Sequence, residues 1–113
     1  MIIASSCSEG FGSAHFRAAQ ARLVDDGADA FLQSLLGKRF ADIDEWQTEM
    51  QLKPMRVGRV QLYTTGLRDE DRRLTGVETV ASVEAALERA IADSGEADIA
   101  VVPEGPYVVP VVA

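Results

Sequence analysis

The side chains best suited to acid/base or metal chemistry are few in this chain, and they lie near its start. His15 is the only histidine and Cys7 the only cysteine, with Glu9 between them. A general acid or base is usually a histidine, a carboxylate of raised pKa or a lysine held in a cleft. A metal site needs several converging ligands at a recognisable spacing. These three residues are too few and too irregular to define one, and His15 is expected as a partly exposed helix residue.

Nucleophilic catalysis has equally little support. Ser8 lies in Ser-Glu-Gly rather than in the Gly-x-Ser-x-Gly turn that exposes a serine nucleophile. Cys7 has only His15 as a possible base, and a chain with one cysteine has no Cys-x-x-Cys motif. An independent hydrolase or redox enzyme is therefore disfavoured.

A glycine-punctuated loop precedes the first expected helix. Exposed amides at a helix N-terminus bind anions, so Gly10, Gly12 and Ser13 are candidate anion-binding residues. The full Gly-x-Gly-x-x-Gly pattern is absent, and a plain tight turn explains the glycines equally well. Both interpretations stay open.

Trp46 is the only tryptophan and stands among acidic and amide residues at the start of an expected helix. Large hydrophobic side chains usually pack inward, and Ile43 and Met50 share its helical face. Alternatively, the indole forms a rigid wall of a ligand pocket, with its N–H available to a polar group. The residues alone do not separate these two roles.

Hydrophobic spacing and turn residues set the expected elements. Ser13 and Ser82 are expected N-caps. Asp42 and Glu45 offer a variant capping box, Gly37 fits a left-handed C-cap, and Pro54 should kink or end its helix. Expected helices cover residues 14–24, 28–36, 42–54, 69–74 and 83–93, and expected strands cover 1–5, 60–64, 78–81 and 99–102, with a last extended segment over 107–112. The first helix should bury Phe16, Ala19, Leu23 and Val24, and the third Ile43, Trp46 and Met50.

The rough alternation of strands and helices predicts a three-layer α/β/α, Rossmann-like domain with a mostly parallel sheet. The apolar run at 99–102 is typical of a strand covered on both faces. A chain of 113 residues fits one domain, here residues 1–113. Because the first strand starts at residue 1, we expect this domain to be a fragment of a longer protein.

Composition limits the partners and the compartment. The net charge is −7 and the isoelectric point about 4.6, so a phosphate backbone would be repelled. No apolar run approaches the ~18 residues of a membrane span, and the N-terminus does not resemble a signal peptide. A single cysteine allows no internal disulfide. We expect a cytoplasmic protein that binds neither nucleic acid nor membrane.

Four segments carry a family resemblance, and together they extend over nearly the whole chain. They are IIASSCSEGFG at 2–12, DEWQ at 44–47, VQLY at 60–63 and VVPEGPYVVP at 101–110. In this order they resemble the C-terminal domain of the nickel-dependent lactate racemase family. The Cys-Ser-Glu-Gly and Gly-Pro-Tyr-Val junctions make the resemblance specific.

The resemblance implies an isomerase that interconverts the stereoisomers of 2-hydroxy acids. In this family a nickel-pincer nucleotide accepts a hydride from the substrate carbon and returns it to either face. The cofactor, the nickel ligand and the acid/base histidines belong to an N-terminal catalytic domain, which would be the partner of this chain. The chain alone would carry no catalytic residue, bind no metal or cofactor, and be inactive.

One site residue follows from the resemblance. Trp46 matches the tryptophan that lines the substrate side of the cleft between the two domains. Pro54 departs from the Leu/Ile/Ala-rich continuation expected in the family, which predicts a displaced helix end. The alternative function is a stand-alone, non-catalytic α/β module that binds an anionic small molecule or a protein partner through residues 10–13.

Overall fold

The centre of the fold is a small parallel sheet. In the computed structural model, which describes residues 1–108 and 111, the strands are β1 (Ile2–Ala4), β2 (Gln61–Tyr63) and β3 (Glu78–Val80), in the order β1-β2-β3. Leu62 of the middle strand is in register with Ile3 on one side and Thr79 on the other. Parallel neighbours need long crossover connections, and helices supply both of them.

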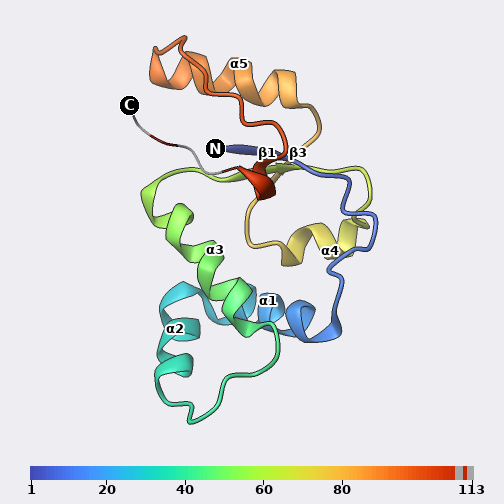
Figure 1. Cartoon of the computed structure of the whole chain (residues 1–113), viewed down its shortest axis with the longest axis vertical. Coiled ribbons are helices and arrows are strands. Elements are labelled where there is room, and N and C mark those ends of the chain that lie inside the picture. The colour runs from blue at the N-terminus through green and yellow to red at the C-terminus, as the bar shows by residue number, and fades with distance from the viewer. Residues whose placement is uncertain (109–110, 112–113) are drawn as a thin grey trace.

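The described part of the chain has five α-helices, and one 3-10 turn, η1 (Gly105–Tyr107), lies near its end. The helices are α1 (Ala14–Asp26), α2 (Ala28–Leu36), α3 (Glu45–Val57), α4 (Asp69–Leu74) and α5 (Val83–Ser94). α5 lies on one side of the sheet, and α3 and α4 lie on the other (Figure 1). α1 packs against α2, α3 and α4, while α5 contacts β1. The chain is therefore mixed α/β with a three-stranded parallel sheet.

Local capping signals were predicted correctly at two helix starts. The Ser13 hydroxyl accepts from the Phe16 N–H at 3.0 Å, and the Ser82 hydroxyl accepts from the Ala85 N–H at 3.1 Å. The left-handed C-cap expected at Gly37 is wrong, because its φ of −81° and ψ of −8° are right-handed. The chain leaves α2 through a tighter turn, in which the Lys38 N–H donates to the Leu35 carbonyl.

The main apolar core lies between α1, α2 and α3. Leu23, Phe31 and Leu52 form its buried centre, and partly buried side chains of α2 and α3 pack around them. The expected burial of Val24 is wrong, since this side chain is 41% exposed. Gln20 is buried in its place, because its amide hydrogen-bonds to Gln51 of α3.

α3 buries a different face from the one expected. Ile43, just before the helix, and Trp46 and Met50 within it are exposed, whereas Glu45, Thr48 and Leu52 are buried. The buried carboxylate is compensated by basic groups, as described below. Pro54 does not end the helix, which continues to Val57, where the Gly58 N–H donates to the Pro54 carbonyl.

The strand expected over residues 99–102 is also wrong. These residues are irregular and exposed, with Val101 at 82%. An apolar run becomes a buried strand only where neighbours pair with it and cover it, and here neither occurs. Of the extended segment expected over 107–112, Tyr107 ends η1, and residues 109, 110 and 112 lie outside the described part. No helix over residues 1–108 is both long and apolar enough to cross a membrane.

Candidate functional site

Trp46 lies in the first turn of α3, and its side chain is 60% exposed. Ile43 and Met50 are exposed beside it in sequence at helical spacing, and we call these three side chains the α3 outer face. Their exposed fractions are 64% for Ile43, 60% for Trp46 and 47% for Met50. These side chains are therefore available for contact with another molecule.

Asp44 fixes the start of α3 and connects it to the loop before α1, residues 7–13, which we call the glycine loop. Its backbone is left-handed, with φ of 62°. One carboxylate oxygen accepts from the Ser13 hydroxyl at 2.5 Å, and the other accepts from the Gln47 side-chain amide at 3.1 Å. Two predicted site residues, Ser13 and Trp46, are therefore held on neighbouring helix starts.

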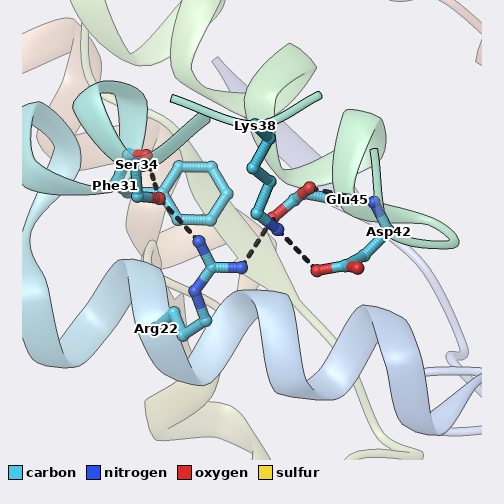
Figure 2. A network of polar contacts seen from close by, with 6 residues as sticks. All are labelled: Arg22, Phe31, Ser34, Lys38, Asp42 and Glu45. Atoms are coloured by element: carbon cyan, nitrogen blue, oxygen red, sulfur yellow. Dashed lines mark hydrogen bonds and ion pairs between the residues drawn. The ribbon is translucent and has the colours of Figure 1, made fainter. Parts of the chain in front are cut away.

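Glu45 anchors the same turn from the inside (Figure 2). It is 2% exposed, and its Oε1 accepts from Arg22 Nη1 at 2.6 Å and from Lys38 Nζ at 2.7 Å. Its Oε2 accepts from the Asp42 N–H at 3.2 Å, which is one half of the expected capping box. The other half is absent from the contacts of the described residues, because the Asp42 carboxylate pairs with Lys38.

The charge balance around Glu45 keeps it ionised. Burial alone would raise the pKa of this carboxyl group, but hydrogen bonds from Lys38 and Arg22 outweigh burial and lower the pKa to about 2. A buried charge with two cationic partners is stable where an unpaired one would be costly. Glu45 is buried in this turn, whereas the adjacent Trp46 is 60% exposed.

Arg22 extends this network into α2. Its Nη2 donates to the Ser34 hydroxyl at 2.6 Å, and its guanidinium lies 5.2 Å from the centre of the Phe31 ring (Figure 2). One side chain therefore connects α1, α2 and the start of α3. Sequence reasoning identified Glu45 only as a cap, since its partners lie on other elements.

The backbone N–H groups of the glycine loop form hydrogen bonds within the loop itself. Gly10 and Gly12 have φ of 60° and 71°, the left-handed region that glycine adopts without strain. The N–H groups of Gly10, Gly12 and Ser13 donate to the carbonyls of Cys7, Glu9 and Phe11. These three amides are thus already paired in the structure.

Two arginines line the same hollow as the loop, which has a volume of about 430 Å³. Asp71 also lines the hollow and accepts from Arg17 Nε at 3.1 Å and from Arg68 Nη2 at 3.2 Å. Burial would raise the pKa of Asp71, but the hydrogen bonds from Arg17 and Arg68 lower it below its usual range. Glu9 is also in the lining. The hollow is therefore lined by two cationic side chains and two carboxylates, so their formal charges balance.

The residues first considered for metal chemistry do not converge. Cys7 is half-buried, while Glu9 and His15 are exposed. Over residues 1–108 and 111, no group of three or more His, Cys, Asp or Glu side chains is placed to hold a metal ion. Cys7, Glu9 and His15 are therefore not brought together as metal ligands in the described part of the chain.

Comparisons of the chain with models of protein families, with curated proteins and with solved structures found no match. The resemblance to the racemase family therefore remains a prediction.

Proposed function

We propose that this chain is the C-terminal domain of a nickel-pincer-dependent 2-hydroxyacid racemase, which closes the substrate cleft and is inactive alone. The observation that carries the proposal is the outward placement of Trp46 on a helix start that buried Glu45 holds in position. The proposal includes the three-layer, Rossmann-like arrangement, which is supported by helices on both sides of the sheet (Figure 1). Metal and acid/base chemistry are assigned to the N-terminal domain.

The role proposed for Trp46 is to wall the cleft and exclude water. Transfer of a hydride benefits from a closed site, and a domain that shuts over the substrate supplies one. A rigid indole covers a large area at a small entropic cost, and its N–H can donate to a polar substrate group. The rest of the α3 outer face would be buried against the N-terminal domain, which favours closure by about 1.5 to 3 kcal/mol for each large apolar side chain fully covered.

The decisive experiment uses the full-length gene product, purified from cells that make the pincer cofactor. We expect nickel to copurify, lactate to racemise, and Trp46→Ala to reduce kcat/KM on the order of tenfold, equivalent to about 1.4 kcal/mol of transition-state stabilisation. Val57→Ala is the matched control, because Val57 is an exposed apolar residue at the other end of α3. Nickel content and thermal stability should be the same in all three proteins.

A folded, nickel-free and inactive product would contradict the racemase proposal. Equal losses in Trp46→Ala and Val57→Ala would contradict the specific role of the indole. The first outcome would favour the alternative, a stand-alone module that binds an anionic small molecule or a protein partner.

The alternative is tested at the hollow that Gly10, Gly12 and Ser13 line, where Arg17 and Arg68 would have to exchange Asp71 for an anion. If the hollow binds anions, titration with inorganic phosphate should shift the amide NMR signals of these residues with a millimolar dissociation constant. Arg17→Ala should weaken that binding, whereas Arg73→Ala, outside the hollow, should not. Unchanged spectra at high phosphate would exclude the anion site.

A further inference from the structure

The outer edge of β1 is unpaired in the described part of the chain. The Met1 carbonyl accepts from the first residue of β2, and the Ser5 N–H donates to the carbonyl of its last residue. Backbone groups alternate in direction along a strand, so the N–H and C=O groups of Ile2 and Ala4 point away from β2. β1 is the first strand in the order β1-β2-β3, and no hydrogen bond between described residues uses these groups. They form a free sheet edge.

The connections between the strands indicate where a further strand belongs. From β1 to β2 and on to β3 the chain moves in one direction across the sheet, and α3 and α4 lie on one face (Figure 1). After β3, α5 lies on the opposite face and contacts β1, so the chain has turned back across the sheet. Parallel crossovers are right-handed in about 98% of cases, and a reversal of direction together with a change of face keeps the same hand. The next parallel strand therefore belongs outside β1, at its free edge.

The segment after α5 has the composition and the position to occupy that edge. Residues 99–102, which we call the C-terminal run, are Ile-Ala-Val-Val, a composition that favours strands. They are exposed, with Val101 at 82%. Residues 95–98 separate the run from α5, which is an ordinary length for a helix-to-strand connection. Between α5 and η1 the chain runs from left to right in Figure 1, as β1 does, which is the direction that parallel pairing requires.

We propose that the C-terminal run is a strap that closes onto the free edge of β1 as a fourth parallel strand. The irregular, exposed arrangement described above is its open position. Closure pairs the free backbone groups of Ile2 and Ala4 and removes aliphatic side chains from water on the face that α5 covers. The strap does not depend on the racemase proposal.

Closure also has a consequence for the glycine loop. Parallel strands end at the same edge of a sheet, so residues 103–107 would lie beside the glycine loop, which follows β1. The strand order reverses at this point, and α/β sheets bind ligands in the crevice outside the carboxyl ends of such strands. The closed strap would therefore supply a second wall to that crevice.

Amide hydrogen exchange of the ¹⁵N-labelled 113-residue chain tests the closure. Only every second residue of a strand directs its N–H at a given neighbour. We therefore expect the Ala4 N–H and alternate N–H groups of the C-terminal run to exchange on the order of tenfold or more slowly than in an unstructured peptide. The intervening N–H groups of the run should exchange fast.

Two proline variants make the test specific. Of Ala100→Pro and Val101→Pro, one removes an N–H that faces β1 and should return the Ala4 N–H to the unstructured rate. The other removes an N–H that faces water, which an edge strand tolerates, and is the matched control. If either variant does not fold, the alternation within the wild-type run decides the question.

Exchange of Ala4 and of the whole run at unstructured rates in the wild-type chain would overturn the proposal. So would equal effects of the two prolines on Ala4, because the edge would then be independent of the run. Protection of Ala4 that rises with protein concentration would also overturn it, since a second copy of the chain would then occupy the edge.

Discussion

Replacing Glu45 with glutamine should reduce the free energy of unfolding at pH 7 by about 3 kcal/mol. The neutral amide cannot serve as a common anionic acceptor for Arg22 and Lys38, which both bond to Glu45 Oε1. Glu45 itself is buried, so the substitution removes two charge-assisted hydrogen bonds from a site that water does not reach, although Arg22 and Lys38 stay partly exposed. Urea denaturation followed by circular dichroism at pH 7 measures the difference.

The pH dependence of stability should change with this substitution. The pKa of Glu45 is about 2 in the folded chain against an ordinary value of 4.5, so the folded state binds its proton less tightly than the unfolded state. The contribution of Glu45 is therefore present above pH 4.5 and is lost as pH falls from 4.5 towards 2. By linkage this contribution is about 3 kcal/mol, and Glu45→Gln should remove it.

Glu49→Gln is the matched control, because Glu49 is an exposed carboxylate one turn further along α3. It should change stability by less than about 0.5 kcal/mol. If wild type and Glu45→Gln lost stability in parallel between pH 5 and 3, the buried ion pairs would not contribute as inferred. The difference between the two curves isolates Glu45 from the other carboxylates of the chain.

The helices whose signals are local were predicted well. α4 was expected at residues 69–74 and is found as Asp69–Leu74, and α2 matches its expected span, 28–36. Ser13 and Ser82 cap their helices because a hydroxyl needs only an N–H three residues ahead, which any helix start supplies. Such features depend on neighbours in sequence, so the sequence contains all the information they need.

The orientation of α3 was not predictable from its own residues. Apolar periodicity favoured Ile43, Trp46 and Met50 as the buried face, yet Glu45 is inside. A carboxylate is buried only if cationic partners meet it, and its partners come from α1 and from the turn after α2. The hydrophobic periodicity of α3 alone gives no information about its contacts with other helices. The functional role of Trp46 could be suggested from the resemblance, whereas its exposure required the tertiary contacts of its neighbour.

The burial of Gln20 shows the same limit. Gln20 interrupts the apolar face of α1, and from sequence it could only be treated as a defect in that face. Its burial depends on Gln51 of α3 and on the Thr75 carbonyl after α4, which together form a continuous chain of hydrogen bonds. At residues 99–102 the error was the reverse, since residues predicted to be buried are exposed. Composition identifies residues able to form a buried strand, but it does not show whether other elements cover them.

Phe31→Ala should destabilise the chain more than Glu45→Gln, with an expected loss of about 3 to 5 kcal/mol in the free energy of unfolding. Phe31 is fully buried and packs with Leu23 and Leu52 at the centre of the core. Truncation removes that contact area, leaves a cavity between α1, α2 and α3, and removes the ring face that Arg22 covers.

Phe40→Ala is the control, since Phe40 follows α2 and is 79% exposed. Urea denaturation should place Phe40→Ala within about 0.5 kcal/mol of wild type. Because Arg22 connects Phe31 to Glu45, the core and the position of Trp46 are physically coupled. In the full-length protein, Phe31→Ala should therefore also weaken the effect of Trp46 on racemisation at temperatures where the chain is still folded. Equal stability of the two phenylalanine variants would mean that α2 does not support α3, and the proposed positioning of Trp46 would lose its structural basis.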